Sequence, residues 1–152
     1  MPVSHLITAA AKPAPPTSKR RRAGAIALGA FLAFAGTSHL TFAREEFQAQ
    51  VPGWVPVDDD VVVLLSGVAE LSLGAALILL RKRRVPVGLA AAAFFVVIFP
   101  GNISQYLTHT DAFGLDTDGK RLVRLFFQPL LVIWALWSTG AWKDLQAALT
   151  KR

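Results

Sequence analysis

The chain has 152 residues, of which 53% are hydrophobic and only 17% are charged, and its mean hydropathy is +0.45. This composition is too apolar for an ordinary soluble domain of that length and indicates an integral membrane protein. The sequence has no cysteine, so disulfides, thiolate metal ligands and cysteine redox chemistry are excluded for this chain alone.

The net charge of +6 is concentrated in two basic runs, residues 19–22 and 81–84, and each run borders an apolar segment. Basic runs in this position orient membrane helices. Many nucleic-acid-binding surfaces alternate basic and aromatic residues, but these two runs contain no aromatic residue. We therefore expect no nucleic-acid partner.

Residues 1–22 are predicted to form a disordered, basic cytoplasmic tail, because prolines and small polar residues cannot bury enough surface to fold. The first membrane span follows at residues 23–40. A cleavable signal peptide is the alternative, since a basic region precedes an apolar core and residues 41–43 resemble a cleavage site. The long leader before the core favours a membrane span instead.

Small residues repeat at helical spacing along this first span, at Ala25, Gly29, Ala33 and Gly36. A stripe of this kind predicts that another membrane helix packs closely against it. The acidic segment 41–60 that follows is expected on the outer side of the membrane. Its apolar part around Trp54 fits either a short segment lying on the membrane surface or an ordinary loop.

The second span, residues 61–80, carries a carboxylic acid, Glu70, at its middle. Inserting an acidic side chain at a bilayer centre costs on the order of 3 kcal/mol, so Glu70 is expected to face other helices and to have a partner. Ser66, Gly67 and Gly74 share its helix face. Glu70 either binds a ligand or handles protons, or it is an acid buried against an arginine that only fixes packing.

The third and fourth spans are predicted at residues 85–103 and 122–139. The turn between the second and third spans is short enough to place them side by side and antiparallel. Pro100 is expected to break the third span just before the outer surface, leaving backbone carbonyls that need other partners. Residues 143–152 are a short cytoplasmic tail, and residues 23–142 form one transmembrane domain.

The basic runs lie on one side of the membrane and the acidic loops on the other, which places both termini in the cytoplasm. The fold class predicted is all-α, an integral membrane up-down four-helix bundle. In that topology, polar side chains from all four spans lie at similar depths in the membrane and converge near the outer leaflet. The candidate ligand-binding or polar cluster comprises Glu70, Arg124, Gln128, His39, Asn102 and Ser66.

Each member of this cluster has a structural alternative. His39 alone fits an interfacial histidine, Arg124 alone fits an arginine that reaches the phosphate headgroups, and Gln128 before Pro129 fits a side chain that satisfies a freed carbonyl. We further expect Glu70 and Arg124 to pair directly or through one polar bridge. No metal is expected, because one histidine and one carboxylate are an incomplete ligand set.

Four motifs stand in a defined order along the chain. They are His39 followed by Val51-Pro52-Gly53-Trp54-Val55-Pro56; Ser66-Gly67-Val68-Ala69-Glu70 with Gly74; Phe99-Pro100-Gly101-Asn102-Ile103; and Arg124 followed by Gln128. This pattern resembles the DoxX family of small four-helix membrane proteins over residues 24–140. The resemblance implies a multi-pass protein of the plasma (inner) membrane of a prokaryote.

Named DoxX relatives are associated with a thiosulfate-oxidising, quinone-reducing membrane complex, while many members have no assigned activity. The larger grouping also resembles membrane proteins that support redox maturation of partners through cysteine pairs, a chemistry that this cysteine-free chain lacks. We do not expect the isolated chain to be an enzyme. The partners expected are the lipid bilayer and either a membrane redox complex or a second copy of the chain.

Three functions follow as hypotheses. The first is a redox-linked or accessory membrane subunit whose outer-leaflet pocket binds a quinone-like or other small amphipathic molecule. In it Glu70 and His39 handle protons, and Arg124 and Gln128 donate hydrogen bonds. The second is a noncatalytic scaffold or partner-recruiting subunit, in which the polar cluster only stiffens the helices. The third is a small-solute transporter, which the absence of an inverted repeat disfavours.

Overall fold

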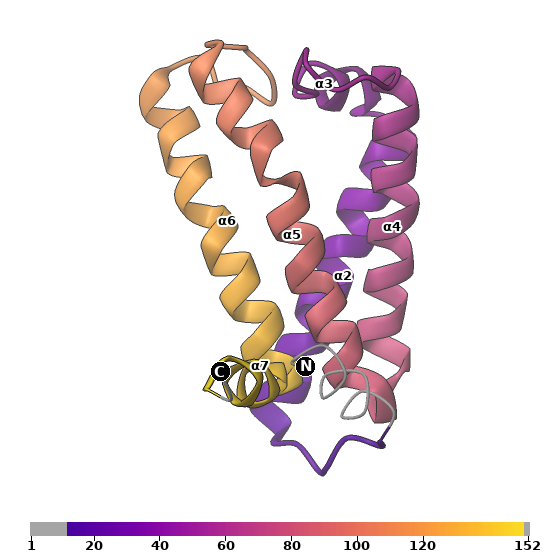
Figure 1. Cartoon of the computed structure of the whole chain (residues 1–152). Coiled ribbons are helices and arrows are strands. Elements are labelled where there is room, and N and C mark those ends of the chain that lie inside the picture. The colour runs from indigo at the N-terminus through magenta and orange to yellow at the C-terminus, as the bar shows by residue number, and fades with distance from the viewer. Residues whose placement is uncertain (1–11, 151–152) are drawn as a thin grey trace.

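A computed structural model describes residues 12–150 of the chain, and all regular structure in this part is helical. The elements are α2 (Lys19–Leu40), α3 (Arg44–Gln48), α4 (Asp59–Leu79), the 3₁₀ turn η1 (Arg81–Arg83), α5 (Arg84–Leu107), α6 (Asp118–Thr139) and α7 (Ala141–Thr150). Figure 1 shows α2, α4, α5 and α6 as four long helices lying side by side. Each is long and apolar enough to cross a membrane, as expected for a multi-pass membrane protein.

Helix boundaries differ from the prediction where side chains cap a helix. Helix α2 begins at Lys19 rather than residue 23, because the Ser18 hydroxyl accepts a hydrogen bond from the backbone N–H of Arg21. Helix α6 begins at Asp118 rather than residue 122, with Thr117 as its N-cap. Residues 19–22 are thus the first turn of a helix, and residues 1–11 of the predicted tail lie outside the described residues.

The predicted break at Pro100 is wrong, because α5 continues through the proline to Leu107. A proline removes a single backbone donor, and one missing bond does not end a helix of this length when its neighbours support it. Next to this point, the Gln128 side chain of α6 donates a 2.6 Å hydrogen bond to the carbonyl oxygen of Phe95. The segment between α5 and α6 is correspondingly shorter than predicted.

The four long helices pack as two pairs, α2 with α4 and α5 with α6. Glycines let the first pair approach: a Cβ added at Gly29 would lie 2.7 Å from the carbonyl oxygen of Gly74, and one at Gly36 would lie 2.7 Å from that of Gly67. The predicted small-residue stripe is therefore confirmed as a helix contact. Although η1 joins α4 to α5, these two helices contact each other far less than α4 contacts α2.

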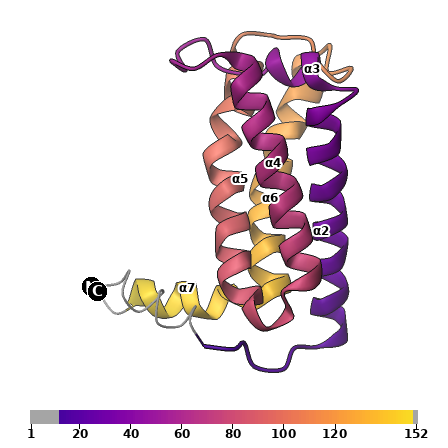
Figure 2. The same ribbon diagram turned by 90° about the vertical axis from the view of Figure 1, so that its right-hand side faces the viewer.

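The two pairs converge at the end that carries η1 and α7 and diverge toward the end that carries α3 (Figure 1). The convergent end holds the apolar core, where Leu28 and Leu32 of α2 meet Leu77 of α4, Ala91 of α5 and Ala135 of α6. Helix α7 runs transverse to the four long helices at this end (Figure 2). At the divergent end the pairs leave room for a site.

Candidate functional site

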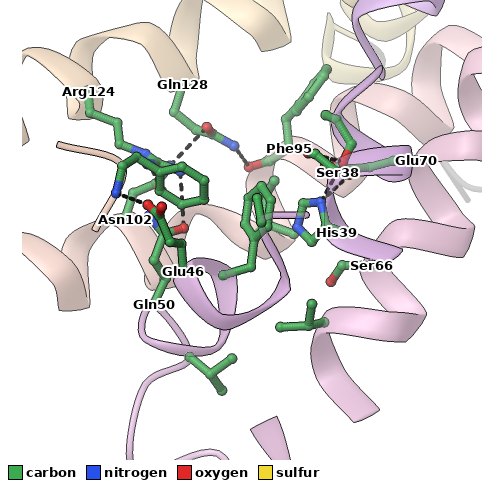
Figure 3. A pocket seen from close by; sticks show the side chains of 18 of the residues that line it. Ser38, His39, Glu46, Gln50, Ser66, Glu70, Phe95, Asn102, Arg124 and Gln128 are labelled. Atoms are coloured by element: carbon green, nitrogen blue, oxygen red, sulfur yellow. Dashed lines mark hydrogen bonds and ion pairs between the residues drawn. The ribbon is translucent and has the colours of Figure 1, made fainter. Parts of the chain in front are cut away.

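A cavity of about 1010 Å³ lies at the divergent end, between the two helix pairs and against α3 (Figure 3). Its lining comes from all four long helices, from α3 and from the segments that follow α3 and α5. The six residues of the predicted cluster all line it: His39, Ser66, Glu70, Asn102, Arg124 and Gln128. They do not form one network, however, but two groups on opposite sides of the cavity (Figure 3).

The first group is the pair of His39 on α2 and Glu70 on α4, both almost fully buried. The Nδ1 atom of His39 lies 2.8 Å from Oε2 of Glu70 and 2.9 Å from the carbonyl oxygen of Ala35. One N–H cannot serve both oxygens well, and Oε2 has no well-aligned hydrogen bond from any residue between 12 and 150. Among the described residues, His39 is thus the ion-pair partner of Glu70.

The other atoms of this first group are free to meet a ligand. Within the described chain, neither Nε2 of His39 nor the hydroxyl of Ser66 has a hydrogen-bond partner. Both residues line the cavity, and neither atom is fully buried. The imidazole ring stacks on Phe47 of α3, with ring centroids 3.3 Å apart. This side of the cavity thus presents one imidazole nitrogen and one hydroxyl next to a carboxyl group.

The second group joins Arg124 to side-chain amides. Its Nε donates to Oδ1 of Asn102 and its Nη2 donates to Oε1 of Gln50, each at 3.1 Å. Asn102 in turn donates to Oε1 of Gln128 at 3.0 Å, and Gln50 donates to Oε1 of Gln105 at 2.9 Å. The guanidinium carbon of Arg124 also lies 5.2 Å from the ring centroid of Phe113, within the range of a cation–π contact.

The expected pairing of Glu70 with Arg124 is wrong. In the part of the chain that the structure describes, Glu70 has its ion pair with His39, and Arg124 has no ion pair. The reason lies in which helices are neighbours: Glu70 faces α2 because α4 packs on α2, whereas Arg124 faces α5 and the segment after α3. No polar bridge joins the two groups across the described residues.

Helix α3 covers the cavity and is held by charges. Arg44 donates two hydrogen bonds to the carboxylate of Asp60 at the start of α4, and Gln48 donates a third at 2.6 Å. The hydrogen bond to Asp60 raises the pKa of Arg44 above its usual value. On the other side, a carboxylate oxygen of Glu46 accepts from the backbone N–H of Phe113. These contacts tie α3 to both helix pairs.

The apolar part around Trp54 is irregular chain, which fits the ordinary loop among the two alternatives predicted for it, whereas the short helix before it was not predicted. Residues 41–60 contain the short helix α3, and irregular chain follows to Asp58. This segment supplies Phe47 and Gln50 to the site, and sequence reasoning missed both. The signal available was Gln50, an uncharged polar residue directly before the apolar stretch 51–57. Trp54 lines the cavity and is 72% exposed.

Apolar side chains make up the rest of the cavity wall. Phe34 of α2, Val97 of α5 and Phe127 of α6 line the cavity, and between 58% and 74% of each residue is exposed. Apolar side chains exposed on a membrane protein face lipid. The cavity therefore has polar groups near α3 and apolar walls that border on the lipid-facing surface.

No group of three or more histidine, aspartate or glutamate side chains within residues 12–150 is placed to hold a metal ion. The resemblance to DoxX proteins rests on the motifs alone and stays a proposal. No curated protein and no solved structure matches the chain. The sequence model of one protein family, described as domain of unknown function DUF8561, matches residues 28–139, and the chain therefore belongs to that family.

Proposed function

We propose that this chain is a DoxX-like membrane subunit that binds a small amphipathic molecule, such as a quinone, in the cavity below α3. The observation that carries the proposal is the coexistence of about 1010 Å³ of space with unpaired polar atoms of His39 and Ser66 inside it. A ligand pocket combines apolar walls with a few polar groups that fix orientation, and this cavity has both.

In this proposal the four long helices form an up-down bundle in the plasma membrane of a prokaryote, with both termini in the cytoplasm. The charge distribution supports that orientation, because residues 19–22 and 81–84 lie at the convergent end. The acidic residues 58–60, 116 and 118 lie at the opposite end, with the cavity. The ligand therefore binds near the outer leaflet.

The chemistry that the residues supply is hydrogen bonding and proton handling. Carbonyl oxygens of a quinone-like head need donors, and Arg124 and the Ser66 hydroxyl provide them. Nδ1 of His39 and Oε2 of Glu70 lie 2.8 Å apart, which is close enough for an imidazole and a carboxyl group to pass a proton, so we assign proton handling to this pair. Electrons must come from a partner protein, which makes the chain an accessory subunit of a membrane redox complex.

The scaffold hypothesis stays as the second candidate because one group of polar residues is largely self-satisfied. Asn102, Gln128 and Gln50 all have their hydrogen-bond partners inside the protein. A pure scaffold, however, leaves no space between such groups. The volume beside His39 and Ser66 favours a binding function.

Titration of the purified protein with a short-chain quinone analogue tests the proposal. Trp54 and Trp134 line the cavity, so a bound quinone quenches the fluorescence of the protein's tryptophans. His39→Gln keeps hydrogen bonding but removes the titrating imidazole, and we expect it to weaken binding or abolish its pH dependence. The control is His109→Gln, a change at an exposed histidine outside the cavity. Absence of saturable quenching in the unchanged protein would favour the scaffold.

A further inference from the structure

Arg124 differs from every other basic side chain near α3. Arg44 pairs with Asp60, Lys120 with Asp116, and Arg121 with two aspartates of the same loop region. Arg124 alone has no carboxylate partner among the described residues at this end of the protein, and its hydrogen bonds go to two neutral amides. The protein thus places a guanidinium in a largely apolar cavity without a counter-charge.

Neither of the two acids that line the cavity, Glu46 and Glu70, forms an ion pair with Arg124. Glu70 lies on the other side and pairs with His39, and the carboxylate of Glu46 accepts from the backbone of Phe113. Figure 3 shows Arg124 across the cavity from Glu70. The lining holds two cationic side chains, Lys120 and Arg124, and Lys120 pairs with Asp116. Arg124 is thus the one that has no carboxylate partner among the described residues and can meet an anion in the cavity.

The guanidinium of Arg124 keeps N–H donors that could hydrogen-bond a carboxylate. Two nitrogens, Nε and Nη2, already donate to Asn102 and Gln50. The third nitrogen, Nη1, has no partner within residues 12–150 and is not buried. The amide bonds and the Phe113 ring fix the plane of the guanidinium, so its remaining donors point in a defined direction.

The apolar walls of the cavity indicate the chemistry of the part of the ligand that lies away from Arg124. Phe34, Val97 and Phe127 both line the cavity and face outward, so an apolar chain that begins at Arg124 can continue along these side chains into the lipid. A ligand of this form has one charged end and one long apolar chain. A soluble anion without such a chain leaves these walls uncovered.

We infer that the cavity selects an amphiphile with a single carboxylate head, of the long-chain fatty-acid class, and that Arg124 binds this head. The inference rests on the proposed function, since it names the ligand class of the same cavity. Glu70 and His39 then lie across the cavity from the bound head and do not serve as its counter-charge. A neutral quinone-like molecule uses the same space but leaves Arg124 unpaired.

Tryptophan quenching by brominated palmitate tests this, with the matching brominated hexadecanol as the uncharged probe. Both are titrated at pH 8 into protein in an uncharged detergent, so that the carboxylate is ionised. We expect the acid to bind about tenfold more tightly than the alcohol, as one charge-assisted hydrogen-bonded pair provides. Arg124→Gln should remove this preference, while Lys143→Gln, which removes one positive charge on α7, should keep it.

Arg124→Lys is the second variant, because it keeps the charge and loses the planar fork; we expect a reduced preference for the acid. If Arg124→Gln does not fold, the test compares the ratio of the dissociation constants for alcohol and acid in the unchanged protein with the same ratio in Arg124→Lys. Equal binding of acid and alcohol, or a preference that survives Arg124→Gln, would overturn the inference. In that case binding of the alcohol or of a quinone analogue leaves the proposed function standing, whereas no binding by any probe rejects both.

Discussion

Gly88 of α5 lies directly against Thr139 of α6, so that a Cβ atom added at Gly88 would lie only 1.9 Å from Oγ1 of Thr139. Thr139 is fully buried, and its hydroxyl donates to the carbonyl oxygen of Ala135 at 2.6 Å. The same hydroxyl accepts from the backbone N–H of Ala141, where α7 begins. This contact therefore joins α5, α6 and α7 at the convergent end and sets how closely α5 and α6 approach each other there.

Replacing Gly88 by alanine should destabilise the protein. The added methyl group overlaps a side chain that has no room to move, and overpacking of this kind costs about 1–3 kcal/mol. Thermal unfolding in detergent, followed by circular dichroism, measures the effect. The control is Gly119→Ala on α6, where no atom lies within 4 Å of the added carbon. Equal melting temperatures for the two variants would show that α5 and α6 do not meet at this point.

The faces through which α2 and α4 meet could be predicted from sequence, because small residues repeat along each of them. Gly29 and Gly36 fall on one face of the first span, and Gly67 and Gly74 fall on one face of the second. The contact at Gly88 could not be predicted in this way. Residues 85–99 have no polar side chain, so nothing in that stretch marks which face meets another helix.

The depth of polar residues in the predicted spans was enough to place His39, Glu70 and Arg124 around one cavity, but it did not give their pairing. Pairing depends on which helices are neighbours, and hydrophobic patterns do not encode that. Helix α3, which covers the cavity, was not predicted for a related reason. Helix α3 has only five residues and is held by the long-range contact between Arg44 and Asp60, so no local pattern announces it.

A double-mutant cycle should show coupling between His39 and Glu70. His39→Gln can still hydrogen-bond Glu70 but removes the ion pair, and Glu70→Gln removes the carboxylate from the same pair. We expect an interaction free energy of about 0.5–3 kcal/mol for this pair, measured by thermal unfolding. The matched cycle of Glu70→Gln with Arg124→Gln should be additive, because these side chains share no contact in the described structure. If coupling appeared only between Glu70→Gln and Arg124→Gln, Glu70 would pair with Arg124, as expected from the sequence.

Labelling of introduced cysteines should report the orientation in the membrane. The chain has no cysteine of its own, so each single substitution gives one site. We expect Ser18→Cys and Thr150→Cys to react from the cytoplasmic side and Thr117→Cys from the outer side, because these positions begin α2, end α7 and precede α6. The measurement compares a membrane-impermeant maleimide on intact cells and on inverted vesicles. Reaction of positions 18 and 117 from the same side would rule out the four-span topology.

Asp60 should control how firmly α3 closes the cavity. Its carboxylate accepts hydrogen bonds from Arg44 and Gln48, and α3 also carries Phe47, whose ring stacks on His39. Asp60→Asn removes the charge and one acceptor, so we expect α3 to open more often and a bound ligand to dissociate faster. The increase should be a few-fold, because the pair is partly exposed to solvent and screened.

Two measurements check this prediction for Asp60→Asn: hydrogen exchange of the backbone amides of residues 44–50, and the rate at which the quinone analogue leaves the cavity. Both should increase together, since the same opening exposes the amides and releases the ligand. Asp59→Asn is the matched control, because Asp59 is the adjacent residue on α4 and makes no ion pair in the described part of the chain. Faster ligand release without faster exchange in α3 would mean that the ligand leaves sideways into the lipid, past Phe34 and Phe127, and that α3 is not the gate.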